Sequence, residues 1–346
     1  MLDDLKYIHD RDAQDALGIA EKQWHQLNTV YDLEGWNDQA GQIENVVFAG
    51  MGGSALAALI ATSWPKINVP FEICRAYDIP AYVGPKTLFI ASSYSGNTEE
   101  TFNALAQAEQ KGAQLAIIAS GGKLADIATE NNYPIARLPD VGQPRFGALA
   151  SLKALATILD KAGLNGEQNA ANTLESESEF VKNIVSSWLP TVATKDNLAK
   201  QLALECIGKS PVIYAGPKLF PAAYKWKISF NENAKNIAWC NALPEFNHNE
   251  FLGWSSHPVD KPYAVIDLRS SLEHERIQKR FEVTDRLLSG KRPAAHVIQA
   301  QGGTVLEHLL WTIALGDFVS LYTALLNGLN PTPVDLIEKF KTSLDD

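Results

Sequence analysis

The sequence predicts an α/β protein of two domains, each with a doubly wound, mostly parallel sheet flanked by helices. The first observation is the length of 346 residues, which is enough for about two domains. The second is a series of short apolar runs, separated by helical segments and followed by Gly, Ser or Asn. Such runs are typical of parallel strands covered on both faces by helices. The third is that both halves of the chain repeat this alternation of apolar runs and helical segments.

The elements follow from the spacing of apolar residues. Residues 11–31 have apolar side chains at helical intervals, which predicts an amphipathic opening helix. The apolar runs predict strands at 46–48, 71–74, 88–91 and 115–119 in the first half, and at 212–215, 263–268 and 296–300 in the second. The apolar stretch 309–326 contains Asp317 and small polar residues, so we expect a buried core helix rather than a membrane span.

A polar stretch at about 165–185 separates the two series of strands and predicts a linker or a connecting helix. We therefore divide the chain into an N-terminal helical segment at 1–30, a first domain at 31–163, a connecting segment at 164–190 and a second domain at 191–346.

The net charge of -10 argues against a nucleic-acid partner. Three scattered cysteines without a CxxC pair fit a reducing compartment better than disulfides or zinc. The first residues are charged and lack the pattern of a secretory signal. We expect a cytoplasmic protein that does not bind membranes.

The strongest chemical signal starts with the loop at 49–55, AGMGGSA, between a predicted strand and an Ala/Leu-rich helix. Glycines let the backbone turn sharply and approach a ligand closely. The free N–H groups at the start of the following helix favour an anion. We assign Gly52, Gly53 and Ser54 to phosphate binding.

A second loop at 92–101, SSYSGNTEET, also joins a strand to a helix. Its hydroxyl groups add donors beside another helix N-terminus, and we assign Ser93, Ser95 and Thr98 to phosphate binding. Both loops should lie at the carboxyl ends of neighbouring strands, where open α/β sheets bind ligands. The turn at 119–123, ASGGK, ends the next strand and would help to form this site.

Other interpretations of these loops are possible. A glycine-rich turn after a strand also occurs in dinucleotide-binding folds, but GxGxxG is missing, and GK[ST] of a Walker loop is missing too. Thr98, followed by Glu99 and Glu100, could simply be the N-cap of a helix. Two such loops at two strand ends favour a phosphate monoester.

Together with three later motifs, these loops identify a family resemblance. GMGGSA and SSYSGNTEET resemble the sugar-isomerase (SIS) domain. Nearly the whole chain resembles the bifunctional phosphoglucose/phosphomannose isomerases of archaea and bacteria, through NENAK at 231–235, LPEFNHNE at 243–250 and PTPV at 331–334. The resemblance implies two SIS domains with flavodoxin-like sheets. It also implies a homodimer with active sites completed across the interface, and neither a metal nor an organic cofactor.

The resemblance implies isomerisation of glucose 6-phosphate, and of mannose 6-phosphate, to fructose 6-phosphate through a cis-enediolate. One carboxylate can move the proton between C1 and C2. The matching base is Glu232, and the matching ring-opening residue is His248, which one subunit lends to the other. The alternatives are that Glu232 pairs at the surface with Lys235, three residues on, and that His248 is a hydrogen-bonded turn histidine.

Three further residues carry roles that the resemblance implies. Arg145 matches an arginine that stabilises the enediolate oxygen or the phosphate; the alternative is a surface arginine after a proline turn. Lys341, with Lys339 as the fallback, matches a lysine of the terminal helix that lies near the sugar; the alternative is a solvated helix end. Thr332 is assigned to substrate binding, where it would help to accommodate both C2 epimers. HxH and HExxH motifs are missing from the sequence, so we expect no metal site.

Two other functions fit the same motifs. One is a non-catalytic, sugar-phosphate-binding regulator of the SIS class, which would usually have a DNA-binding helix-turn-helix and a basic face. The other is a different SIS enzyme, such as an aminosugar-phosphate isomerase, which would often have a glutaminase domain that begins with cysteine. Neither feature is found in this sequence.

Overall fold

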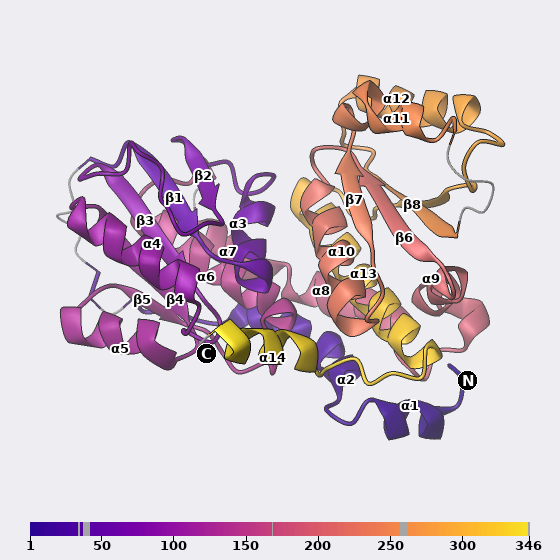
Figure 1. The fold of residues 1–346 in the computed structure, drawn as a ribbon, viewed down its shortest axis with the longest axis horizontal. Coiled ribbons are helices and arrows are strands. Elements are labelled where there is room, and N and C mark those ends of the chain that lie inside the picture. Colours follow the sequence, from indigo (N-terminus) through magenta and orange to yellow (C-terminus); the bar gives the residue numbers. More distant parts are fainter. Residues whose placement is uncertain (34, 37–41, 168, 257–261, 345–346) are drawn as a thin grey trace. The chain divides into compact units, whose positions relative to one another are not determined.

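The computed structural model describes residues 1–33, 35–36, 42–167, 169–256 and 262–344. The chain forms two compact units. We call Lys22–Lys182 the first-sheet unit, and Met1–Glu21 together with Asn183–Asp346 the second-sheet unit (Figure 1). The N-terminal helices therefore belong to the same unit as the C-terminal half of the chain, whereas the boundaries drawn from sequence lie at 30, 163 and 190.

The first-sheet unit contains five parallel strands in the order β2-β1-β3-β4-β5, which is the flavodoxin-like order. They are β1 (Asn45–Ala49), β2 (Phe71–Cys74), β3 (Thr87–Ser92), β4 (Gln114–Ala119) and β5 (Ile135–Arg137). All six residues of β3 are buried. A strand covered on both faces must be apolar on both, which explains the short, continuous apolar runs in the sequence.

Helices cover both faces of this sheet (Figure 1). Residues from α4 and α5 share a buried cluster with Val47, Phe89 and Ile117. Side chains alternate along a strand, so Phe48 and Ile90 lie on the opposite face, with α3 and α6. The helices are η1 (Gln23–Asn28), η2 (Gly52–Ala55), α3 (Leu56–Ala61), α4 (Glu99–Gln110), α5 (Gly122–Asn131), η3 (Pro144–Gly147), α6 (Ala148–Lys161), α7 (Ala170–Ser176) and α8 (Ser178–Val185), the last crossing the boundary between the units.

The second-sheet unit contains four parallel strands in the order β7-β6-β8-β9. They are β6 (Ser210–Ala215), β7 (Trp239–Ala242), β8 (Tyr263–Arg269) and β9 (His296–Gln299). Its helices are α1 (Leu5–Arg11), α2 (Ala16–Glu21), η4 (Ser186–Trp188), η5 (Thr194–Asp196), α9 (Leu198–Cys206), α10 (Phe220–Asn233), η6 (Glu245–His248), α11 (Glu250–Gly253), α12 (Glu275–Leu287), α13 (Val305–Leu326) and α14 (Asp335–Leu344). Both sheets confirm the predicted doubly wound α/β class, and all seven predicted strands are present.

Within the described residues, one helix, α13, is long and apolar enough to cross a membrane. Its most apolar window is 94% buried inside the protein. It packs against α10 and α9 and is the core helix expected at 309–326.

Two expectations about local structure are wrong. The single helix expected at 11–31 is broken into separate turns, because the carboxylate of Asp12 accepts the N–H groups of Ala16 and Leu17 at 2.8 Å and Asp15 has a φ of 54°. The pattern of apolar runs also did not predict β5 and β7. β5 has only three residues, and β7 is an edge strand whose residues are partly or largely exposed, so neither gives a clear apolar run.

Candidate active site

In the first-sheet unit, the loops after β1 and β3 are joined by hydrogen bonds. The Ser92 hydroxyl donates to the Ser54 carbonyl at 3.1 Å, and the Tyr94 N–H donates to the Ser54 hydroxyl at 2.9 Å. A Cβ at Gly50 would lie 3.0 Å from the Ser92 carbonyl oxygen, so this close approach requires glycine. β1 and β3 flank the point where the strand order reverses, which is the usual ligand position in such sheets.

The hydroxyl groups of Ser93 and Thr98 lie 2.8 Å apart. Ser93 is buried, and Thr98 occupies the N-cap position of α4 without making a side-chain cap bond. Thr98 is therefore at the N-cap position, but its hydroxyl contacts Ser93 instead of capping the helix. Ser95 is exposed, and its hydroxyl accepts the Asn97 N–H at 3.2 Å. The start of α4 thus combines uncapped N–H groups with two adjacent hydroxyls, which is suitable for binding an anion.

The turn after β4 supports this loop. Gly96 has a φ of 69°, and its carbonyl accepts the Leu124 N–H at 3.0 Å. A Cβ at Gly96 would overlap the carbonyl of Gly121, so no other residue fits there. The turn at 119–123, which follows the fourth strand, therefore holds the second loop in place.

Arg145 lies in η3, directly against the first loop. It is fully buried, its Nη1 donates to the Gln143 side chain at 3.2 Å, and its guanidinium lies 4.6 Å from the Phe146 ring centroid. A Cβ at Gly53 would lie 2.8 Å from the Arg145 backbone nitrogen. The alternative of a surface arginine is therefore wrong. The structure brings together Arg145 and five of the six predicted phosphate-binding residues, which are Gly52, Gly53, Ser54, Ser93 and Thr98.

The second-sheet unit has a cavity of about 790 Å³ at the amino edge of its sheet. Glu232, in the last turn of α10, lies on its wall and is partly buried. Lys227 and Asn231 of the same helix also line it, and the segment 333–337 forms another part of the wall. A carboxylate, an ammonium group and an amide in one cavity can bind a polyhydroxylated molecule and move a proton. The complete lining is Lys227, Asn231, Glu232, Lys235, Asn236, Ile237, Ala238, Trp239, Asn330, Pro333, Val334, Asp335, Leu336 and Ile337.

The end of α10 is tied to the segment that follows α13. Lys235 has a φ of 51°, and its ammonium donates to the carbonyls of Asn233, Asn330 and Pro331 at 2.8–3.2 Å. These bonds fix the end of α10 to the segment 330–331. The buried Thr332 follows directly, next to Pro333 on the cavity wall.

His248 and Lys341 do not line this cavity. His248 is exposed in η6, beyond the carboxyl end of β7, whereas Glu232 lies near the amino end of that strand. The four residues of β7 alone span roughly 13 Å. Lys341 is exposed on α14, where it pairs with Glu338 at 2.8 Å, and the fallback Lys339 is exposed too. One second-sheet unit therefore does not bring Glu232 and His248 together.

The turn after β6 occupies the same topological position in the second sheet as the glycine-rich loop does in the first. Here a carboxylate of the protein itself fills the turn. Glu273 is buried and accepts the Lys218 N–H at 2.7 Å, and a Cβ at Gly216 would overlap this carboxylate. Burial raises the pKa of Glu273. Only the first of the two turns thus remains available for an external anion.

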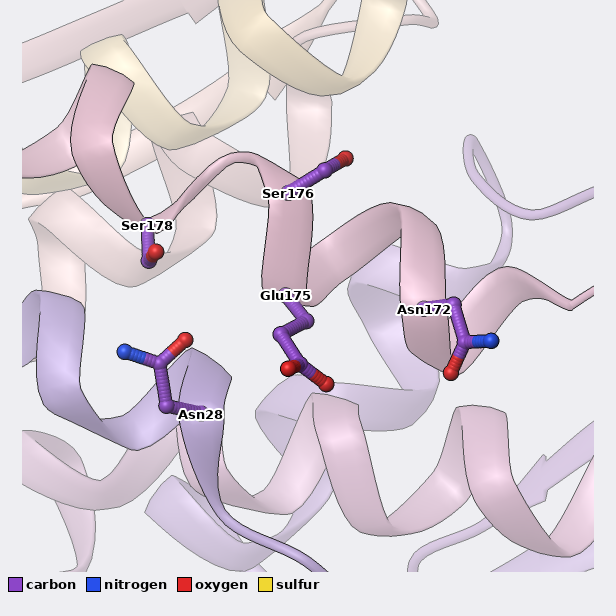
Figure 2. A pocket seen from close by; sticks show the side chains of 5 residues that line it. All are labelled: Asn28, Asn172, Glu175, Ser176 and Ser178. Carbon is purple, nitrogen blue, oxygen red and sulfur yellow. The ribbon is translucent and has the colours of Figure 1, made fainter.

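The first-sheet unit has a hollow of about 560 Å³, shown in Figure 2. Its wall consists of polar side chains, and Glu175 among them pairs with Lys153 at 3.4 Å. None of the predicted site residues lines it. The side chains that line the hollow are Asn28, Asn172, Glu175, Ser176 and Ser178.

Among the residues that the structure describes, we find no group of three or more His, Cys, Asp or Glu placed to hold a metal ion.

Sequence reasoning missed two residues of these sites. Tyr94 lies inside the SSYSGNTEET motif, but its contacts with other loops follow only from the fold. Lys227 precedes Glu232 by five residues on the same helix, and helical spacing alone does not show that both reach one cavity.

Known proteins are similar to this chain over much of its length. Residues 195–344 match the family described as the bacterial phospho-glucose isomerase C-terminal SIS domain. The bifunctional phosphoglucose/phosphomannose isomerase of Caldicellulosiruptor bescii is 35% identical over 312 residues, covering 89% of this chain and 91% of that protein. The D-glucosamine-6-phosphate 4-epimerase of Sulfolobus acidocaldarius is 31% identical over 224 residues, covering 64% of this chain and 68% of that protein.

A crystal structure of a glucose-6-phosphate isomerase like protein from Thermus thermophilus has the same fold. Its TM-score is 0.64 at 17% sequence identity, with 98% of each chain covered. At this identity the likeness concerns the fold alone, and it supports two sheets of the sugar-isomerase type.

Proposed function

The chain belongs to the family of bifunctional phosphoglucose/phosphomannose isomerases, and on that premise we propose that it converts glucose 6-phosphate and mannose 6-phosphate to fructose 6-phosphate and back. The observation that carries the proposal is the pair of joined loops after β1 and β3, which offer hydroxyl and amide donors to an anion without a lysine. An aldose and a ketose that share a 6-phosphate fit a site of this kind.

The loops hold the phosphate group. The hydroxyls of Ser54, Ser93 and Thr98 and the free N–H groups at the start of α4 supply hydrogen bonds to its oxygens. Arg145 provides a positive charge that is already buried and oriented. Such a charge stabilises the anionic oxygen of an enediolate, or the phosphate, without further reorganisation.

Glu232 acts as the base. Its carboxylate takes the proton from C2 of the open-chain aldose, the C1–C2 enediolate forms, and the same carboxyl group returns the proton to C1. C2 is planar in the intermediate, so the two C2 epimers lead to the same enediolate. Thr332, beside the cavity that contains Glu232, would help to accommodate both epimers, and Lys341 would reach the sugar from α14.

His248 opens the sugar ring, and we propose that it does so in the active site of a partner subunit. The positions of Glu232 and His248 at opposite edges of one sheet support this proposal. The active protein is then a homodimer in which each subunit supplies the histidine for the other.

A mixing experiment tests this exchange of histidines. Glu232→Gln and His248→Ala homodimers should each be nearly inactive. After the subunits are exchanged at equal amounts, activity should rise to about a quarter of wild type, because half of the dimers are mixed and each mixed dimer has one complete site. A mixture that stays inactive, although differently tagged subunits co-purify, would contradict the shared site.

The activity itself is tested with the purified protein in coupled assays. We expect turnover of glucose 6-phosphate and mannose 6-phosphate that is unchanged by EDTA. Glucosamine 6-phosphate serves as the third substrate, because an epimerase of this sugar is among the relatives. Epimerisation of the aminosugar without isomerisation of the hexose phosphates would favour the epimerase, and binding without turnover would favour a regulator.

A further inference from the structure

The hydroxyl of Tyr94 reaches the segment that leads to Arg145. It accepts the Val141 N–H at 2.7 Å and donates to the Asp140 carboxylate at 3.1 Å. The same carboxylate oxygen accepts the Gly142 N–H at 2.9 Å. One phenol group therefore closes the turn at 140–142, only three residues before Arg145.

The backbone of Tyr94 connects the other loops of the site. Its N–H donates to the Ser54 hydroxyl at 2.9 Å, which fixes the first loop. Its carbonyl accepts the Ser120 N–H at 3.0 Å and the Ser120 hydroxyl at 2.5 Å, which fixes the turn after β4. Tyr94 is thus bonded to three other segments, each of which follows a different strand.

The ring of Tyr94 also packs against the far end of η3. A Cβ at Gly147 would lie 3.6 Å from the ring, which is van der Waals contact distance, so the end of η3 lies directly beside the tyrosine. At the start of η3, Gly53 approaches the backbone nitrogen of Arg145, as described above. The short helix that carries Arg145 is therefore in contact with the glycine-rich loop at its start and with the tyrosine at its end.

We propose that Tyr94 is a positioning residue for the isomerase: its hydroxyl holds the 140–147 segment so that the Arg145 guanidinium stays directed at the charge that forms on the substrate. This inference rests on the proposed function. Without the hydroxyl, the Val141 N–H and the Asp140 carboxylate lose their common partner, and the turn before η3 can relax. The substrate then meets an arginine that is present but less well oriented.

A double-mutant cycle tests the proposal. Tyr94→Phe removes only the hydroxyl, and we expect kcat/KM for glucose 6-phosphate to fall about tenfold, as is typical when a buried donor loses its partner. In an Arg145→Ala background the same change should alter kcat/KM less than about twofold, because the residue that it positions is already missing. Tyr133→Phe is the matched control, since that hydroxyl bonds the exposed Glu109 at another edge of the unit, and it should leave kcat/KM unchanged.

Equal losses in both backgrounds, or no loss in Tyr94→Phe, would overturn the proposal. If Tyr94→Phe does not fold, Asp140→Ala takes its place in the cycle, and Asp140→Asn, which keeps an acceptor oxygen, should recover most of the lost kcat/KM. A wild type that is inactive on all three sugar phosphates would instead contradict the proposed function. In that case the cycle is measured by calorimetry as the affinity for inorganic phosphate of wild type, Tyr94→Phe, Arg145→Ala and the double variant. Non-additive changes in affinity would support the role of Tyr94, and additive changes would overturn it.

Discussion

Glu232→Gln is expected to lower kcat for both hexose phosphates by about a thousandfold, with KM changed by less than about threefold. Glutamine has the same shape as glutamate and can keep hydrogen bonds to the sugar, but it cannot accept the C2 proton. The loss should therefore appear in the chemical step. Single-turnover rates with glucose 6-phosphate labelled with deuterium at C2 measure that step directly.

A matched control is available on another helix of the same unit. Glu205 is the penultimate residue of α9, as Glu232 is of α10, and Lys209 lies 3.7 Å away on the surface. Glu205→Gln should leave kcat within about twofold of wild type, because an exposed pair contributes little. If Glu232→Gln retained a tenth or more of the wild-type rate, Glu232 would not be the base.

The second large effect concerns stability. Lys225 on α10 and Asp317 on α13 form a buried ion pair, and Ser229 donates to the Asp317 carboxylate at 3.1 Å. Lys225→Met leaves that carboxylate buried without its cation. We expect the free energy of unfolding to fall by about 3–5 kcal/mol. Urea unfolding followed by tryptophan fluorescence measures this loss, since Trp226 is buried beside the pair and donates to the Thr312 carbonyl at 2.7 Å.

Two variants separate the cost of the unpaired charge from that of the substitution. Lys225→Met combined with Asp317→Leu removes both charges and should recover most of the lost stability, because an apolar pair of similar volume often replaces a buried ion pair without cost. Lys209→Met breaks the exposed pair with Glu205 and should cost less than about 1 kcal/mol. Equal losses in Lys225→Met and Lys209→Met would show that the buried pair does not stabilise the contact between α10 and α13.

The sequence alone predicts seven of the strands and the loops after β1 and β3 well, because both depend on local patterns. Short apolar runs mark strands that are buried on both faces, and glycine and serine after such a run mark a turn at the carboxyl end. For the same reason β7 was missed: at the sheet edge, Trp239 and its neighbours need not be apolar on both faces. The helix break at Asp12 was missed because a side-chain cap competes with the apolar periodicity.

What the amino-acid sequence by itself determined is the fold class, the family and the glycine- and serine-rich loops after β1 and β3. Only the tertiary structure decided that Arg145 is buried against Gly53, that Tyr94 joins the segments of one site, and that Glu273 fills the equivalent turn of the second sheet. It also placed Glu232 and His248 at opposite edges of one sheet. The physical reason is that a turn or a strand depends on neighbours in sequence, whereas burial and partnership depend on residues that the fold brings together from distant parts of the chain.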